Sequence, residues 1–374
     1  MIPFNKQNLF GKELLYIKDA FDNGKVCGDG KYTKLCNKFM EERFEAKKVL
    51  LTTSCTHALE MAAILSDINE GDEVIMPSYT FVSTADAFAL RGAKIVYCEI
   101  REDNINMDEN KIEQLITPKT KAIVPVHYAG VACEMDKIME IAKKHDLIVV
   151  EDAAQGVDAK YKDKYLGTIG DFGCYSFHET KNFSCGEGGA IVINNEKYIE
   201  RAEIIREKGT NRSKFFRGQI DKYTWVDIGS SYLLSDINAA VLYNQFENIE
   251  NINEKRKKIF ETYYNELKKY EDNNNLRLPI INDYAKTNYH MFYILLSTLE
   301  ERDGLMNYLK EKGVWSVFHY IPLHTSQYSI KNYGEFSLPI SEDISNRLLR
   351  LPMFFSLEIE NVIAIAKIIK EYFE

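Results

Sequence analysis

Several features that would assign a chain to other classes of protein are missing from these 374 residues. No apolar run approaches the roughly 18–20 residues of a membrane span. The start of the chain, MIPFNKQNLF, has neither the basic nor the apolar region of a signal peptide. Basic residues are not in excess either, since the net charge is -9 and a nucleic-acid partner would require a basic surface. We therefore expect no membrane and no nucleic acid among the partners of this protein.

The cysteines lack the pattern of a disulfide scaffold. There are seven of them, an odd number, and no Cys-x-x-Cys occurs. Cys98 and Cys174 lie in apolar runs, which is typical of small buried hydrophobic residues. This usage indicates a reducing compartment, so we expect a cytoplasmic protein, and we predict no metal site.

Glycine is missing where a dinucleotide-binding fold would need it. The first predicted strand, residues 49–51, runs into Thr-Thr-Ser-Cys-Thr and then into an apolar helix, residues 58–65. A Rossmann-type epimerase or dehydrogenase would have Gly-x-Gly-x-x-Gly at this turn, so we discount that class. The small hydroxyl residues suit a helix N-cap. The same turn also suits a phosphate, because free backbone amides and the helix dipole attract anions.

Short apolar runs alternate with helical patterns through the first two thirds of the chain. This alternation predicts a mostly parallel sheet with helices on both faces. The expected strands are residues 73–76, 94–97, 121–126, 147–150, 174–177 and 190–193. Residues 209–225, which are polar and rich in arginine, lysine and aromatics, read as a long loop that is functional or lies at an interface.

A second unit follows a charged helical stretch at residues 246–270. We expect strands at 291–296 and 315–319 and helices at 302–312 and 358–372, which is an α+β arrangement, and we expect 271–275 to be a solvated loop. A chain of this length favours one large domain and one smaller domain. We place the large domain at residues 1–248 and the small domain at residues 249–374.

Three kinds of reactive side chain follow two predicted strands. Asp152 comes at the end of VVED, Ser176 ends CYS, and Lys181 follows in FHETK before the glycines of GEGGA. Ligands of open α/β sheets bind at the carboxyl ends of strands. A carboxylate, a hydroxyl and an amine together suit pyridoxal phosphate, where the amine forms a Schiff base. Asp152 could instead be a helix N-cap, with Gln155 completing a capping box.

Aromatic and imidazole side chains also follow strand ends. Tyr79, in PSYTF, would lie at the ligand edge or pack in the core. His127 reads as a structural histidine with its hydrogen bonds satisfied. His319, Tyr320 and His324 follow the last short strand, where they would contact the substrate or pack.

Over essentially its full length the chain resembles the DegT/DnrJ/EryC1 aminotransferases, which aminate keto groups of nucleotide-linked sugars. The resemblance lies in PSYTFVST, VPVHYAG, VVEDAAQ, CYSFHETK with GEGGA, and FHYIPLH. It implies a fold-type I α/β architecture, pyridoxal 5'-phosphate as cofactor, and a homodimer with shared active sites. FRGQIDKYTWVDIGSSY and the GDG near residue 29 are most similar to members that make dTDP-4-amino-4,6-dideoxygalactose from dTDP-4-oxo-6-deoxyglucose and L-glutamate.

The resemblance also implies roles for individual residues. Lys181 would bind the cofactor covalently and Asp152 would face its pyridine nitrogen, while Gln155 would lie near the phenolic oxygen and Ser176 on the phosphate. Cys55 and Thr56 would hold the phosphate from the other side, and Tyr79 would stack on the ring. Many relatives have Gly-x-Asn-x-Arg in the segment that reaches the neighbouring subunit's phosphate. Here a serine, Ser231, stands in place of the asparagine and Leu233 in place of the arginine.

The expected reaction is a two-step transamination in which the freed Lys181 amine moves the α-proton of glutamate. Positioned bases of this kind contribute roughly 10²–10⁴-fold in rate. Three alternatives remain: a relative acting on another nucleotide sugar or on a C3 keto group, a ligand-sensing relative without catalysis, and a dehydratase. Dehydrating relatives have histidine in place of the lysine, so Lys181 argues against the last.

Overall fold

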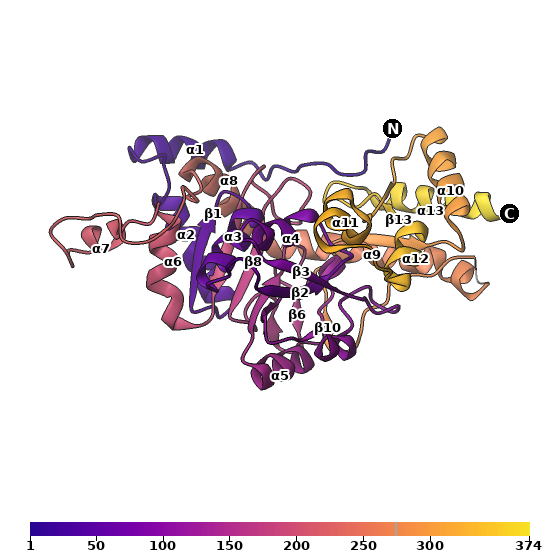
Figure 1. The fold of residues 1–374 in the computed structure, drawn as a ribbon. Helices are drawn as coiled ribbons and strands as arrows, with labels where there is room; N and C mark the ends of the chain where they lie inside the picture. The colour runs from indigo at the N-terminus through magenta and orange to yellow at the C-terminus, as the bar shows by residue number, and fades with distance from the viewer. Residues whose placement is uncertain (274) are drawn as a thin grey trace.

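A seven-stranded sheet forms the centre of the computed structural model, which describes residues 1–273 and 275–374. The strand order is β1-β9-β8-β5-β4-β2-β3. Strands β2 to β5 and β8 pair in parallel, whereas β9 is antiparallel to both of its neighbours. The strands are β1 (Lys48–Thr52), β2 (Glu73–Pro77), β3 (Lys94–Cys98), β4 (Thr120–Ile123), β5 (Ile148–Asp152), β8 (Phe172–Ser176) and β9 (Gly189–Ile193). The predicted mostly parallel sheet is confirmed (Figure 1).

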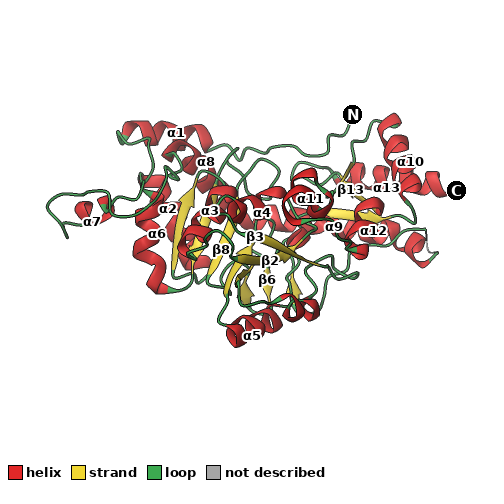
Figure 2. Cartoon of the chain, viewed as in Figure 1, coloured by secondary structure: helices red, strands yellow, loops and turns green. Residues whose placement is uncertain are grey.

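Helices cover both faces of this sheet, as predicted (Figure 2). Alternate strand residues point to opposite faces, so Val49 and Leu51 pack on one side and Leu50 on the other. The first face carries α1 (Glu13–Asp22), α2 (Lys31–Arg43), α5 (Met135–His145) and α8 (Asp236–Glu247). The second carries α3 (Cys55–Leu65), α4 (Val82–Ala89) and α6 (Ile199–Arg206).

A second, smaller sheet with the order β11-β13-β12 has its own hydrophobic cluster. Its strands are β11 (Phe292–Leu295), β12 (Val317–Phe318) and β13 (Leu348–Leu351), all antiparallel. Helix α9 (Ile249–Asp272) leads from the large sheet to this cluster, in which α10 (Leu299–Glu311) and α13 (Ile359–Phe373) also pack. The division into domains at residue 248 stays a prediction.

Between the two sheets the chain forms part of a separate three-stranded sheet of order β10-β6-β7. Strand β10 (Ala285–Lys286) pairs with β6 (Lys160–Tyr161), which also pairs with β7 (Lys164–Tyr165). At the other end of the chain, Ile2 forms a bridge with Val314, so the N-terminal segment runs from the small sheet across to α1 (Figure 1). The N-terminal segment contacts the loop after β8, where Asn5 and Gln7 donate to the Glu179 carbonyl, and Asn288, which follows β10, donates to the Gln155 carbonyl after β5.

Some elements differ from the sequence-based expectation. Strand β13 and the helices α11 (Gln327–Tyr333) and α12 (Pro339–Arg347) were not predicted. The loop predicted at 209–225 contains a short helix, α7 (Arg212–Phe216). The loop predicted at 271–275 begins later, because α9 continues to Asp272, and position 274 lies outside the described residues. In the described part of the chain, every helix is too short or too polar to span a lipid bilayer.

Candidate active site

Asp152 lies at the carboxyl end of β5, as predicted, and is only 6% exposed. The Thr84 hydroxyl donates a 2.7 Å hydrogen bond to one carboxylate oxygen, and the Ala154 amide donates to the other at 3.1 Å. Thr84 in turn shares a 2.8 Å hydrogen bond with Thr80. These contacts fix the orientation of a buried carboxylate at the edge where ligands of such sheets bind. Thr84 was not predicted, because a threonine within a helix carries no functional signal.

The neighbouring carboxylate, Glu151, points to the opposite face of the same strand, as successive strand residues do. It accepts hydrogen bonds from the amides of Gly167, Ile169 and Gly170 at 2.7–2.8 Å. It also lies 2.9 Å from Nε2 of His127, and neither side chain is exposed. His127 therefore has a structural partner, which agrees with its interpretation from the sequence.

Lys181 lies in the loop between β8 and β9 and is half-buried. Burial of the amine lowers its pKa, and the nearby Cys55 and Asp152 oppose this shift by favouring the charged form. Lys181 also lines one cavity with Ala154, Gln155 and Ser176, at the strand ends where Asp152 lies. Side chains of the N-terminal segment hold the loop, because Asn5 and Gln7 both donate hydrogen bonds to the Glu179 carbonyl.

The predicted phosphate-binding residues meet around Gly189. In the sheet register Gly189 lies between Ser176 and Thr52. A Cβ at Gly189 would be only 2.3–2.5 Å from backbone atoms of Ser54 and Cys55, so glycine allows the start of α3 to approach β9. The first amides of a helix have no partner within it, so those of Cys55 and Thr56 are available to an anion next to the Ser176 hydroxyl. This geometry favours the phosphate interpretation of the turn, although Ser54 also caps the helix by accepting from the His57 amide.

Gln155 is buried between the two sheets. Its side-chain oxygen accepts a 2.6 Å hydrogen bond from the Ala129 amide, and its Nε2 donates to the Tyr320 hydroxyl at 3.3 Å. Gln155 therefore joins the large-sheet edge to Tyr320, which the sequence placed at the substrate.

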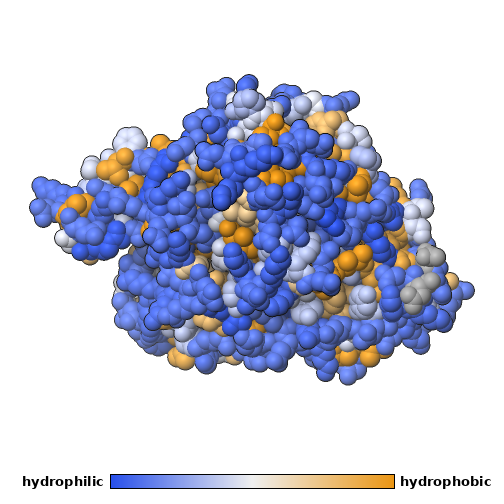
Figure 3. All heavy atoms as spheres, turned by 90° about the horizontal axis from the view of Figure 1, so that it is seen from below, coloured by the Kyte–Doolittle hydropathy of each residue, from blue (hydrophilic) through white to orange (hydrophobic). Residues whose placement is uncertain are grey.

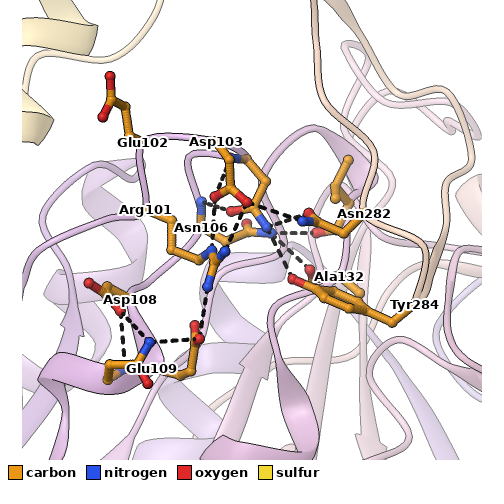
Figure 4. Close-up of polar contacts among 12 residues, drawn as sticks. Arg101, Glu102, Asp103, Asn106, Asp108, Glu109, Ala132, Asn282 and Tyr284 are labelled. Carbon is orange, nitrogen blue, oxygen red and sulfur yellow. Dashed lines mark hydrogen bonds and ion pairs between the residues drawn. The ribbon is translucent and has the colours of Figure 1, made fainter.

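A polar network joins the loop at residues 101–109 to Asn282 and Tyr284 (Figure 4). Asn106 accepts from the Tyr128 amide at 2.8 Å and donates to the carbonyls of residues 131 and 132. In the same loop, Asp103 accepts a 3.1 Å hydrogen bond from Asn282, which precedes β10. The network ties the loop at residues 101–109 both to Tyr128 and to the segment leading into the small sheet.

Tyr79 does not lie where the resemblance implied. It is 1% exposed, and its ring makes edge contacts with Tyr128 at 5.4 Å and Tyr320 at 5.9 Å between centroids. A residue packed in this way has no free face for a cofactor ring. Phe81, two residues later at the N-cap of α4, is 57% exposed and lies 6.2 Å from Tyr320. Both aromatics stand in PSYTF, and the sequence alone does not say which one is exposed.

His324 is also placed differently from the prediction. It is 1% exposed, its Nδ1 lies 2.7 Å from the Ser78 hydroxyl, and its Nε2 lies 3.1 Å from Glu342. Both ring nitrogens are thus engaged, and His324 fastens the segment after β12 to the large sheet rather than facing a substrate. His319, in contrast, remains at the site, where its Nδ1 lies 3.0 Å from the Tyr128 hydroxyl.

Ser231 is exposed and is the last residue of an arm that we define as residues 209–231. It lies at the base of this arm, where it forms a bridge with Glu207. The arm projects from the large sheet at the left of Figure 1, where it carries α7. Its exposed apolar side chains are Phe215, Phe216, Tyr223, Trp225, Val226 and Ile228. In the space-filling view of Figure 3, apolar patches interrupt the polar surface of this projection. The arm thus presents Ser231 and an apolar surface outward.

Taken together, the side chains fit pyridoxal phosphate. The amine of Lys181 and the carboxylate of Asp152 suit the two ends of its ring, and the amides at the start of α3 with Ser176 suit its phosphate. Sequence reasoning missed Thr84 and Phe81, and it also missed Arg350 on β13.

Comparisons with known proteins agree with this geometry. The model of the DegT/DnrJ/EryC1/StrS aminotransferase family matches residues 9–370. The GDP-perosamine synthase of Escherichia coli O157:H7 is 32% identical over 377 residues, which cover 100% of this chain and 98% of the relative. The crystal structure of S. venezuelae DesV superposes with a TM-score of 0.91 and 28% identity, covering 100% and 98% of the two chains. The PLP form of Spr1654 from Streptococcus pneumoniae superposes with a TM-score of 0.91 and 25% identity over 99% and 98% of the chains.

Proposed function

Since this chain belongs to the DegT/DnrJ/EryC1/StrS aminotransferase family, whose members depend on pyridoxal phosphate, we propose that it transfers the amino group of L-glutamate to the 4-keto group of a nucleotide-linked 6-deoxy sugar. The observation that carries the proposal is the cavity at the carboxyl ends of β5 and β8, which Lys181 lines together with Gln155 and Ser176, next to Asp152. A buried amine beside a carboxylate fits transamination and argues against a relative that only senses ligands.

Lys181 is the proton-transferring residue of this proposal. Burial lowers the pKa of its amine, which increases the neutral fraction able to take a proton from the donor's α-carbon. The bound cofactor supplies a ring that accepts the electron pair left behind. Asp152, held by Thr84, favours a positive charge on the ring nitrogen and so strengthens this electron-accepting ring.

Other residues orient the cofactor. The amides of Cys55 and Thr56 and the hydroxyl of Ser176 would hold the phosphate, and Gln155 would lie near the phenolic oxygen. Phe81, rather than Tyr79, would cover the ring, because it is the exposed aromatic at this edge. His319 and Tyr320 remain the proposed sugar contacts of the small-sheet side.

A homodimer would complete the site. The arm exposes several apolar side chains together with Ser231, and exposed apolar patches of this kind mark protein contacts. We propose that the arm of one subunit reaches the other subunit's phosphate site, where Ser231 donates a hydrogen bond. All seven cysteines are free, which supports a reducing, cytoplasmic location.

The proposed acceptor is dTDP-4-oxo-6-deoxyglucose, and the product dTDP-4-amino-4,6-dideoxygalactose. This choice rests on the sequence of the arm, FRGQIDKYTWVDIGSSY. A GDP-linked keto sugar is the second candidate, because the full-length relative from Escherichia coli O157:H7 is a GDP-perosamine synthase by name. A sugar with its keto group at C3 is the third.

The test is to incubate the purified protein with pyridoxamine phosphate and dTDP- or GDP-linked 4-keto-6-deoxy sugars. Mass spectrometry identifies amination and NMR identifies the configuration at C4. A galacto-configured amine from the dTDP-linked sugar is the expected result. A gluco-configured amine, or turnover of only the GDP-linked sugar, would reject the specific substrate and leave the reaction type in place. No amination of any keto sugar would reject the function.

A further inference from the structure

Arg350 is a cation at the site for which the described residues provide neither a hydrogen bond nor an ion pair. It lies on β13, the middle strand of the small sheet, opposite Tyr293 on β11 and Val317 on β12. Its Nε is buried and makes no hydrogen bond, and among the described residues no carboxylate lies within ion-pair distance of its guanidinium. A nitrogen that is buried without a hydrogen bond costs folding free energy, and an anionic ligand would supply the missing acceptor.

The N-terminal segment connects Arg350 with the loop that carries Lys181. The guanidinium lies 4.8 Å from the centre of the Phe4 ring, which holds it from the side of the N-terminal segment. Its charge contributes to the lowered pKa values of Lys181, His290 and His319. Burial lowers the pKa of Arg350 itself, and the surrounding hydroxyl groups are those of Tyr79, Tyr128 and Tyr320, not carboxylates.

Two nearby arginines show what a structural role looks like in this fold. Arg347, three residues earlier, forms an ion pair with Asp343 and donates to the Leu296 carbonyl at 2.9 Å. Arg256 on α9 donates to the backbone carbonyls of Tyr289 and His290. Both fasten chain segments through hydrogen bonds, whereas the described residues give the Arg350 guanidinium none.

We propose that Arg350 binds the α-carboxylate of the amino-acid donor. A guanidinium can hold a carboxylate through two parallel hydrogen bonds, which fixes both its position and its plane. The α-carboxylate is bonded to the carbon that gives its proton to Lys181, so its binding residue must lie near that amine. Arg350 meets this condition, because its guanidinium contacts the Phe4 ring and the next residue, Asn5, donates to the carbonyl of Glu179, two residues before Lys181.

The nucleotide sugar is the other anion that enters this site, but its charges suit Arg350 less well. Its diphosphate is attached across the sugar ring from the keto carbon, and so lies farther from Lys181 than a donor carboxylate does. The assignment rests on the proposed function only in requiring an amino-acid donor.

The test compares Arg350→Met and Arg350→Lys with Arg347→Met as the matched control. In the holoenzyme, the conversion of the cofactor by L-glutamate is followed by absorbance, with no sugar present. Arg350→Met should raise the half-saturating glutamate concentration about 10- to 100-fold, because charge-assisted hydrogen bonds are lost. Arg350→Lys should recover part of the loss, and Arg347→Met should leave the value within about twofold of wild type.

A binding measurement tests the same assignment without catalysis. Glutarate, which has the carboxylates of glutamate but no amino group, should bind the wild-type holoenzyme by calorimetry and bind Arg350→Met at least about tenfold more weakly. L-glutamine keeps the α-amino group and the α-carboxylate but has an amide in place of the side-chain carboxylate, so its conversion should suffer the same loss. A loss confined to glutamate would overturn the assignment to the α-carboxylate.

The stability of the variants separates a binding role from a structural one. Arg350→Met keeps an apolar side chain and removes an Nε that is buried without a hydrogen bond, so the melting temperature without donor should change little. A fall in melting temperature with unchanged glutamate and glutarate affinity would overturn the proposal. A rise in KM for the nucleotide sugar alone would overturn it too, by assigning Arg350 to the diphosphate. If no keto sugar is aminated, the glutamate and glutarate measurements still decide the role of Arg350.

Discussion

The two sides of the site are built differently. On the cofactor side, defined by Asp152, Gln155, Ser176 and the start of α3, the side chains already have hydrogen-bond partners within the chain. On the donor side, defined by Arg350, His290, His319 and Tyr320, the described residues offer Arg350 no carboxylate. The cofactor side is therefore preorganised, whereas the positive charge of Arg350 on the donor side is available to an anionic ligand.

This difference matches how long each ligand stays. A cofactor that remains through many turnovers is best held by residues fixed by their own neighbours. Donor and acceptor alternate on the other side, so any internal partner of Arg350 would compete with the incoming carboxylate. The comparison therefore predicts that changes on the cofactor side alter the chemistry, and that changes on the donor side alter affinity and pH dependence.

Lys181 stands between the two sides, and Lys181→Ala should have the largest effect. The visible absorbance of covalently bound cofactor should disappear, and turnover should fall by at least about 10²-fold, because the positioned base is lost. Absorbance spectra and steady-state rates measure both. Lys164→Ala, at an exposed lysine of β7, is the control and should change neither. Survival of both the absorbance and the turnover in Lys181→Ala would remove the basis of the comparison.

Substitutions of the adjacent carboxylates Asp152 and Glu151 should have opposite effects: the first should lower turnover, and the second should lower stability. Asp152→Asn removes the charge that faces the cofactor, while its oxygen can still accept from the Ala154 amide and its NH₂ group can donate to the Thr84 hydroxyl. Turnover should fall about 10²–10³-fold with little change in stability. Glu151→Gln turns an NH₂ group toward backbone amides that now donate to a carboxylate, which should cost about 1–3 kcal/mol per unsatisfied donor.

Urea unfolding and steady-state rates of the two variants decide this point. If Asp152→Asn unfolds more easily but keeps its rate, Asp152 is a structural residue and the cofactor side has been assigned wrongly. A Glu151→Gln variant of normal stability would likewise contradict the role given to the amides of residues 167–170.

The arm tests whether the cofactor side is completed by a second subunit. Trp225 is 76% exposed, and Trp225→Glu should place a charge in the proposed interface and shift the protein toward monomers. The affinity for pyridoxal phosphate should fall, while the glutamate concentration needed by the remaining holoenzyme should not change. Sedimentation and cofactor titration measure these effects. The control is Ile363→Glu, which places the same charge at an exposed apolar residue of α13 and should leave the oligomeric state and the cofactor affinity unchanged. A fully dimeric Trp225→Glu protein would argue against the arm as interface.

The sequence predicts the cofactor side far better than the donor side, for a physical reason. Asp152 ends one short run of buried strand residues and Lys181 follows another, and strand order then brings the two strand ends to one edge. Strand β13 is only LLRL, and it becomes a strand through pairing with β11 and β12, which are distant in sequence. The burial of Tyr79 and of His324 likewise depends on contacts with residues 128, 320 and 342. Such long-range contacts leave no local pattern.

The smallest expected effect concerns His290, whose pKa is lowered well below its ordinary value of 6.5 by burial and by the charges of Lys181, Arg256 and Arg350. The unfolded chain therefore binds a proton that the folded chain does not. The stability is fully present above pH 6.5 and falls as the pH drops below it, by about 1.4 kcal/mol per pH unit for this group.

His290→Asn keeps a donor for the 2.9 Å hydrogen bond to Asn182 but does not titrate. Urea unfolding between pH 7.5 and 5.5 should show a shallower loss of stability in this variant, by up to the same slope. The replacement of a buried ring by a smaller side chain lowers stability at every pH, so the difference in slope is the informative quantity. Equal slopes for the two proteins would mean that His290 is already protonated beside three cations. In that case an anion must be balancing the donor side, and the contrast between the two sides would be lost.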